Sequence, residues 1–214
     1  MTNAASAIVD SLGQLGRLAD LVAETLASEI ADVADRTLTT LREGGRLFFC
    51  GNGGSAADAQ HLAAEYVVRF AREREALPAQ ALTTDSSILT AASNDHGFET
   101  VFARQIQAFG REGDLLFLHS TSGESDNLIL AAEAARARGV YTVAMLARGG
   151  GRLAGQVDQA LIVPTDITAR AQEIHLALGH SICEWVENAW SDEDQRGAPH
   201  ALDPPDSATS TRPE

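Results

Sequence analysis

The stretch that decides the fold is FFCGNGGSAADAQHLAAEYVVRF, which runs from Phe48 to Phe70. An apolar run typical of a buried strand stops at the glycine-rich segment GNGGS, residues 51–55. A helical pattern follows and carries His61 and Glu65 one turn apart on the same face. The stretch therefore predicts a strand, a loop that lets a ligand approach the backbone, and a helix bearing two polar groups.

The same order of strand, loop and helix recurs along the chain. Apolar runs predict further strands, and residues recurring at three- and four-residue steps predict the helices between them. The expected helices cover residues 4–43, 127–139 and 169–190, and the expected strands cover 47–50, 111–120 after an opening turn, 140–146 and 159–164. Short apolar strands alternating with helices indicate an α/β fold, a parallel sheet with helices on both faces.

Length, charge and composition narrow the class of protein. The chain has 214 residues, enough for one substantial core, and it carries 16 Lys plus Arg against 30 Asp plus Glu, a net charge of -14. This acidic balance argues against binding to nucleic acid or to an anionic membrane surface. No apolar run approaches the roughly 18 residues needed to span a bilayer. We expect a cytoplasmic protein.

The chain divides into one expected domain and a tail. The domain covers residues 1–190, and the tail over 191–214 is acidic, contains prolines and has almost no large apolar groups, so we expect it to be disordered. Cys50 and Cys183 each lie in an apolar stretch without metal-type spacing. We expect both cysteines to be small buried hydrophobic groups rather than a disulfide or a nucleophile.

Two loops that follow predicted strands should lie at the carboxyl edge of the sheet, where α/β folds bind ligands. GNGGS lacks the Walker lysine and the spacing of a dinucleotide fingerprint, so on its own a plain strand-to-helix turn is equally acceptable. The loop STSGES, residues 120–125, offers more hydroxyls than helix capping requires, which favours a phosphate site. These hydroxyls belong to Ser120, Thr121, Ser122 and Ser125. Glu124 should point to solvent.

Polar groups on two helices are candidates for a shared site. His61 and Glu65 can bind one divalent ion or pair directly, although an ordinary His–Glu pair is the simpler interpretation. Arg69 lies one turn further along the same helix face, and we expect it to contact a substrate oxyanion. On the last predicted helix, Gln172 and His180 are separated by about 12 Å of rise and about 80° of rotation. A shared ion would require that the helix begins after Gln172 or that a second subunit supplies one of them.

Four segments together resemble the phosphoheptose isomerases, which are the sedoheptulose 7-phosphate isomerases of the sugar isomerase (SIS) fold. The segments are GNGGSAADAQHLAAE, SNDHGFETVFARQ, STSGES and AQEIHLALGH. They occur in the family's order and at its spacings, and the resemblance covers residues 5–190. It implies a single SIS domain with an N-terminal helical segment.

The resemblance also implies an activity and a site. The activity is the aldose–ketose isomerisation of sedoheptulose 7-phosphate to D-glycero-D-manno-heptose 7-phosphate, with one zinc ion per active site, in a homotetramer whose active sites lie between subunits. Glu65 and His180 match the family's acid–base pair. The metal positions are matched by His61, Glu65, Gln172 and His180. The substrate contacts are matched by Asn52, Gly53, Gly54, Ser55, Glu65, Asn94, Asp95, Ser120, Thr121, Ser122, Ser125 and Gln172.

Three departures and three alternatives accompany the resemblance. The segment RGGG, residues 148–151, modifies the family's usual loop there. Ala169 stands where many relatives carry an acidic residue, and His119 replaces a small or aliphatic residue, where we expect it to crowd the loop or touch the ligand. The alternatives are a non-catalytic scaffold similar to a replication-initiator-binding protein, a sugar-phosphate sensor, and an isomerase of another ketose phosphate. The presence of both Glu65 and His180 favours catalysis over the scaffold.

Overall fold

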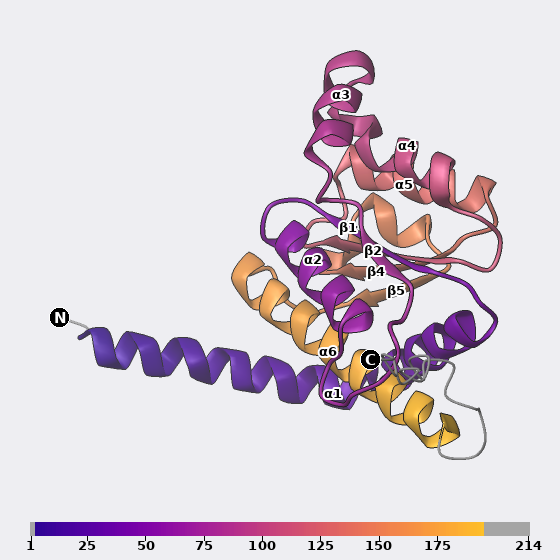
Figure 1. Cartoon of the computed structure of the whole chain (residues 1–214). Coiled ribbons are helices and arrows are strands. Elements are labelled where there is room, and N and C mark those ends of the chain that lie inside the picture. The colour runs from indigo at the N-terminus through magenta and orange to yellow at the C-terminus, as the bar shows by residue number, and fades with distance from the viewer. Residues whose placement is uncertain (1–2, 195–214) are drawn as a thin grey trace, which may run out of the picture.

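The computed structural model describes residues 3–194, with the backbone alone over residues 191–194. Helices and strands alternate along this range (Figure 1). The helices are α1 (Ala4–Arg42), α2 (Gly54–Val67), α3 (Ser86–His96), α4 (Val101–Phe109), α5 (Asp126–Ala137) and α6 (Thr168–Asp194). The strands are β1 (Leu47–Gly51), β2 (Ala79–Ala81), β3 (Leu115–Ser120), β4 (Tyr141–Leu146) and β5 (Gln159–Ile162). One-turn 3₁₀ helices cover Phe98–Thr100, Arg148–Gly150 and Arg152–Gly155.

The five strands form one parallel sheet in the order β2-β1-β3-β4-β5. From β1 the chain crosses to β2 on one side and returns to β3 on the other side of β1. The carboxyl ends of β1 and β3 are therefore the point where the direction of winding reverses, and Gly51 is paired there with His119. In sheets of this kind ligands bind in the crevice at that point.

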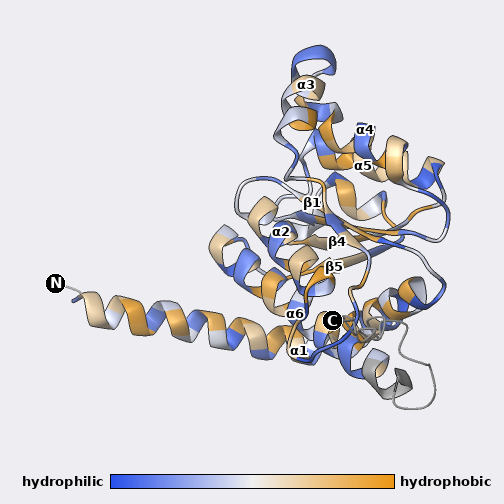
Figure 2. Cartoon of the chain, in the orientation of Figure 1, coloured by the Kyte–Doolittle hydropathy of each residue, from blue (hydrophilic) through white to orange (hydrophobic). Residues whose placement is uncertain are grey.

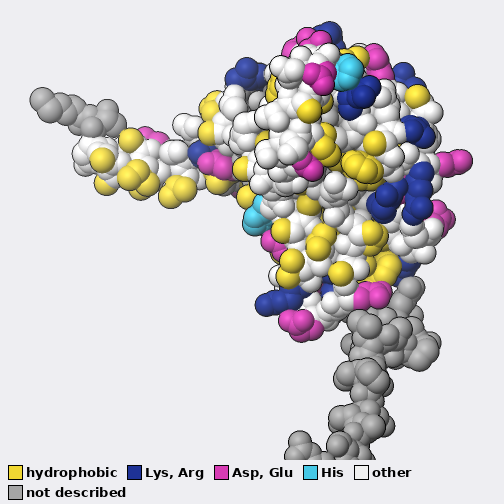
Figure 3. Space-filling model, turned by 45° about the horizontal axis from the view of Figure 1, so that its top comes forward, with side chains coloured by type: hydrophobic (Ala, Val, Ile, Leu, Met, Phe, Trp, Pro, Cys, Tyr) yellow, Lys and Arg dark blue, Asp and Glu magenta, His cyan; other side chains and the backbone are white. Residues whose placement is uncertain are grey.

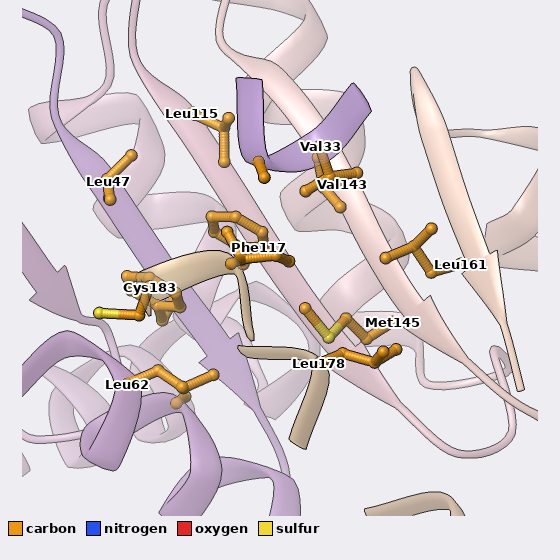
Figure 4. Packing of buried hydrophobic residues seen from close by; sticks show 14 of the residues in the cluster. Val33, Leu47, Leu62, Leu115, Phe117, Val143, Met145, Leu161, Leu178 and Cys183 are labelled. Atoms are coloured by element: carbon orange, nitrogen blue, oxygen red, sulfur yellow. The ribbon is translucent and has the colours of Figure 1, made fainter. Parts of the chain in front are cut away.

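Alternate residues of the strands point to opposite faces of the sheet, and both faces are buried. One face packs under α1, α2 and α6 and includes Leu47, Phe49, Leu115 and Phe117 (Figure 4). The other face includes Phe48, Cys50, Leu116 and Leu118 and packs under α4 and α5. Burial on both sides explains why the strands are continuous apolar runs in the sequence.

The first helix extends beyond the body of the domain. Asn3 caps α1, since its Oδ1 accepts from the Ser6 amide at 2.8 Å, and the N-terminal half of the helix projects away from the sheet (Figure 1). This projecting arm is apolar along one side (Figure 2). Ile8, Val9 and Leu12 are 59%, 67% and 62% exposed. The arm therefore presents an apolar surface that no other part of residues 3–194 covers.

The predicted fold class is confirmed, with differences at element boundaries. The last helix begins at Thr168 and ends at Asp194, so it continues past the expected end at Trp190 into the stretch assigned to the tail. The rest of the expected tail lies outside the described residues. Cys50 and Cys183 are free and buried, as predicted. No helix within residues 3–194 is both long and apolar enough to cross a membrane.

Candidate active site

The loops after β1 and β3 lie against each other at the carboxyl edge of the sheet. The side-chain amide of Asn52 donates to Asn127 Oδ1 at 2.9 Å, and the Asn127 amide donates back to Asn52 Oδ1 at 2.9 Å. This reciprocal pair fixes the GNGGS loop to the first turn of α5. Asn127 was not among the predicted site residues, although its position just after STSGES, at a helix start, could have drawn attention to it.

The GNGGS loop is shaped by glycine. Gly53 has φ 57° and ψ −121°, a conformation open to glycine and strained for other residues. Gly54 lies against α6, where an added Cβ would come within 2.6 Å of Gln172 Nε2. Ser55 follows in the first turn of α2 and is buried. The loop therefore presents backbone at close range, with the amide of Gln172 beside it.

The STSGES loop is folded by its own hydroxyls. Ser120 Oγ accepts from the Gly123 amide at 2.9 Å, and Ser122 Oγ accepts from the Glu124 amide at 3.2 Å. Ser125 is the N-cap residue of α5, yet its hydroxyl makes no capping hydrogen bond. Because that hydroxyl and the first amides of α5 remain available, the turn can bind an anion.

A neighbouring segment, residues 148–155, packs over this turn and was not predicted to take part. Its Leu153 amide donates to Gly123 O at 3.0 Å. Glu124 does not simply point to solvent as expected, because its carboxylate pairs with Arg152 Nε at 2.7 Å and Asp126 pairs with the same guanidinium at 2.9 Å. The pairing lowers the pKa of Glu124, chiefly through hydrogen bonds from Arg152. One positive charge thereby offsets part of the charge of the two carboxylates beside the turn.

His61, Glu65 and His180 converge within one chain. His61 Nε2 lies 2.8 Å from His180 Nε2 and 3.3 Å from Glu65 Oε1. One ligand atom from each residue lies within 4.8 Å of the other two. Two imidazoles and one carboxylate at this spacing suit a divalent transition metal. Burial and the nearby His61 lower the pKa of His180, while Glu65 opposes the shift, so the neutral imidazole is favoured.

The close approach of α2 and α6 brings these three groups together. At Gly179 an added Cβ would come within 2.5 Å of the Leu62 side chain, so glycine lets the two helices pack here without displacing Leu62. Gly179 immediately precedes His180, and Leu62 immediately follows His61. A glycine inside an otherwise apolar helix was the sequence signal for this contact, and it was overlooked.

The placement of Gln172 corrects one expectation. The last helix includes Gln172, so a helix beginning after that residue is wrong. The side chain of Gln172 lies against Gly54, at the start of α2. His180 is two helical turns further along α6, and its imidazole lies beside that of His61. The convergence of His61, Glu65 and His180 needs no second subunit.

Three other predicted residues lie apart from this cluster. Arg69 follows the end of α2 and pairs with Glu73 at 3.1 Å, so it does not continue the stripe of His61 and Glu65. Asn94 donates to Asp95 at 2.7 Å on α3, which projects from the top of the view in Figure 1. Within the described part of the chain, no side-chain hydrogen bond or ion pair joins either residue to α2 or α6.

His119 is also placed differently from the expectation that it crowds the loop or touches the ligand. Its side chain is fully buried beneath the sheet edge. The rings of Phe49 and His175 lie 6.4 Å and 6.3 Å from it, centroid to centroid. Neither ring nitrogen of His119 has a hydrogen-bond partner among the described residues. Burial, with His175 nearby, lowers its pKa from 6.5 to about 3.

Comparison with known proteins agrees with this geometry. Residues 12–147 match the model of the SIS domain. A phosphoheptose isomerase from Roseiflexus sp. (strain RS-1) is 55% identical over 170 residues, covering 79% of this chain and 86% of that protein. Solved phosphoheptose isomerases from Neisseria gonorrhoeae and Francisella tularensis align with TM-scores of 0.82 and 0.84 and identities of 39% and 33%. Each alignment covers 87% of this chain and 100% of the other.

The parallel sheet, with a loop after β1 and another after β3 where its winding reverses, and the match over residues 12–147 define a SIS domain protein. The full-length relatives narrow the class further. The chain belongs to the phosphoheptose isomerase family.

Proposed function

We propose that this chain is an enzyme that isomerises sedoheptulose 7-phosphate to D-glycero-D-manno-heptose 7-phosphate. The observation that carries the proposal is that Glu65 and His180 both converge on His61, and that Glu65 and His61 lie on the helix that begins in the GNGGS loop. Relatives of similar length bear the name phosphoheptose isomerase, which supports a heptose phosphate as the substrate.

The two loops would hold the substrate's anionic end and its hydroxyls. A phosphate fits the hydroxyls and helix amides of residues 120–125, because it accepts hydrogen bonds at a helix N-terminus without needing a net positive charge. Asn52, Gly53, Gly54 and Ser55 would contact the sugar from the neighbouring loop, and Gln172 would contact it from α6. Such fixation at several points holds the reacting carbons in one orientation.

The chemistry requires a proton to move between adjacent carbons. Glu65 would remove a proton from C1 of the ketose and return it to C2, so that the carbonyl moves from C2 to C1 through an enediol. His180 would carry the proton that passes between the two oxygens. The lowered pKa of His180 keeps its imidazole neutral near neutral pH, which is the form that can bind a metal or accept a proton.

We further propose one zinc ion per site, held by His61, Glu65 and His180 of one chain and by Gln172 of a neighbouring subunit, because within one chain Gln172 lies two turns from His180. The fit rests on the two imidazoles and the carboxylate whose ligand atoms lie within 4.8 Å of one another. A bound zinc ion would polarise the carbonyl oxygen of the sugar.

A homotetramer in the cytoplasm, with active sites between subunits, completes the proposal. The apolar arm of α1 is exposed (Figure 3), and an apolar groove between α1 and α6 includes Ile30, Ala177 and Trp185. Exposed apolar surface of this kind is typical of protein interfaces. A neighbouring subunit would then bring Asn94 and Asp95 to the site, which they do not reach within one chain.

The test is incubation with sedoheptulose 7-phosphate, with and without a chelator, while the appearance of aldose is followed. The wild type should turn over and lose activity with the chelator, and Glu65→Gln should be inactive yet folded. Glu133→Gln, which changes an exposed carboxylate on α5, is the matched control and should keep full activity. Binding without turnover by a zinc-loaded wild type would favour the sugar-phosphate sensor, and neither binding nor turnover would favour the scaffold.

A further inference from the structure

A buried ion pair lies next to the cluster of His61, Glu65 and His180 without belonging to it. Arg74 Nε lies 3.3 Å from Glu187 Oε1, and the two side chains are only 1% and 3% exposed. A buried pair of this kind is costly to break, because removal of one partner leaves the other charge without compensation. Arg74 follows α2, whereas Glu187 lies on α6, so the pair links the two helices that carry the cluster.

Arg74 is attached to the end of α2 that bears Glu65. Its Nη2 donates to Glu65 O at 2.7 Å and its Nη1 donates to Tyr66 O at 2.8 Å. Both carbonyls are in the last turn of α2, where no intrahelical amide can reach them. The guanidinium therefore caps this helix end and fixes the backbone of Glu65.

Glu187 fixes the segment between α2 and β2. Its carboxylate accepts hydrogen bonds from the amides of Phe70, Ala71 and Arg72 at 3.0, 2.8 and 2.9 Å. Burial alone would raise the pKa of Glu187, but these amides and Arg74 outweigh it and lower the pKa, so the group stays ionised.

The same segment touches the second catalytic candidate. The ring of Phe70 packs on the imidazole of His180, with the two centroids 5.4 Å apart. Glu187 itself lies two helical turns after His180 on α6 and faces the same side. The network thus reaches Glu65 through Arg74 and reaches His180 through Phe70.

We propose that Arg74 and Glu187 form a positioning pair that holds Glu65 and His180 in their mutual geometry. The inference deepens the proposed function, because it rests on the roles assigned there to Glu65 and His180. Neither Arg74 nor Glu187 touches substrate. Each acts by fixing backbone: the Glu65 carbonyl in one case and the Phe70 amide in the other.

The test compares two conservative variants with the wild type. Arg74→Lys keeps the charge but loses the fork that reaches two carbonyls at once, and Glu187→Gln keeps the shape but loses the charge. Both should lower kcat by about tenfold to a hundredfold while KM changes by less than about threefold, since misplacement acts on the reacting geometry. Titration with Co2+, followed by its visible spectrum, should show an affinity about tenfold weaker.

A matched control separates positioning from stability. Arg46 also bridges a buried carboxylate and a carbonyl, because it pairs with Asp114 at 2.9 Å and donates to Phe109 O. It lies just before β1, at the opposite edge of the sheet from the two ligand loops. Arg46→Lys should therefore lower the melting temperature yet keep kcat and Co2+ affinity.

Two results would overturn the inference. One is wild-type kcat and Co2+ affinity in folded Arg74→Lys and Glu187→Gln. The other is a loss of kcat and Co2+ affinity in Arg46→Lys that equals the loss in Arg74→Lys and Glu187→Gln, when all three variants lose the same stability. If the Arg74 and Glu187 variants do not fold, Phe70→Leu decides: it leaves the backbone amides in place, and unchanged kcat and Co2+ affinity there would refute positioning. Because the Co2+ titration needs no substrate, failure of the proposed reaction in the wild type is distinguishable from failure of this inference.

Discussion

The buried imidazole of His119 should make the protein measurably sensitive to acid. The ring is fully buried, neither of its nitrogens is hydrogen-bonded to a group within residues 3–194, and burial lowers its pKa from 6.5 to about 3. Since the folded state holds the neutral form, the unfolded chain binds more protons between these two pH values. Stability is therefore lost as the pH falls below 6.5, and this loss continues until about pH 3.

The size of the effect follows from the pKa shift. At pH 5 the unfolded histidine is about 1.5 pH units below its pKa, which corresponds to about 2 kcal/mol of lost stability. His119→Leu should remove this loss. At pH 7 the same substitution should stabilise the protein by about 1 kcal/mol, because it removes an unsatisfied buried polar group. His175, whose pKa is also lowered by burial, remains in both proteins.

The assay is urea denaturation of wild type and variant at pH 7 and pH 5, at one protein concentration because association affects apparent stability. The difference in unfolding free energy between the two proteins should grow by about 2 kcal/mol from pH 7 to pH 5. His96→Leu, which removes an exposed imidazole on α3, should show no such growth. Parallel pH dependences in wild type and His119→Leu would refute the reasoning.

Three further predictions concern the phosphate turn and the thiols. Gly123→Ala forces a side chain into a turn with φ 66° and should raise KM about tenfold in the isomerase assay, whereas an unchanged KM would remove the turn from the substrate site. Arg152→Gln exposes the turn to uncompensated carboxylates and should raise KM at low salt, while Glu124→Gln should lower it; both effects should shrink at high salt. Burial raises the pKa of Cys183 to about 12 and also raises that of Cys50, so iodoacetamide should leave activity intact. Rapid inactivation would show that a thiol is accessible.

The fold was predictable for the elements whose burial produces a recognisable pattern of apolar residues in the sequence. β1, β3 and β4 are covered on both faces, so they appear as apolar runs ending at glycine- and serine-rich loops. The edge strand β2, Ala79–Ala81, has three residues and no apolar run, so it carries no such signal. No prediction covered α3 or α4.

The sequence singled out His61, Glu65 and His180, which the structure brings together, but it did not give their arrangement. The distance between Gln172 and His180 along one helix argued that they cannot share an ion, and the structure indeed places them two turns apart, against different parts of α2. The contact between Leu62 and Gly179 depends on tertiary packing, which helix periodicity does not encode. The burial of His119, in contrast, could have been predicted from the sequence. Alternation along β3 puts it on the same face as Phe117, in the core.

The most direct test of the central claim is subunit mixing between Glu65→Gln and His180→Gln. Mass-tagged variants are unfolded together, refolded, and checked by native mass spectrometry for mixed oligomers before sedoheptulose 7-phosphate is added. Because His61 joins both residues within one chain, every site in a mixed oligomer lacks one of the pair, and no activity should return. Recovery of about a quarter of wild-type activity, the statistical share of intact sites when a site draws one residue from each of two chains, would contradict the account.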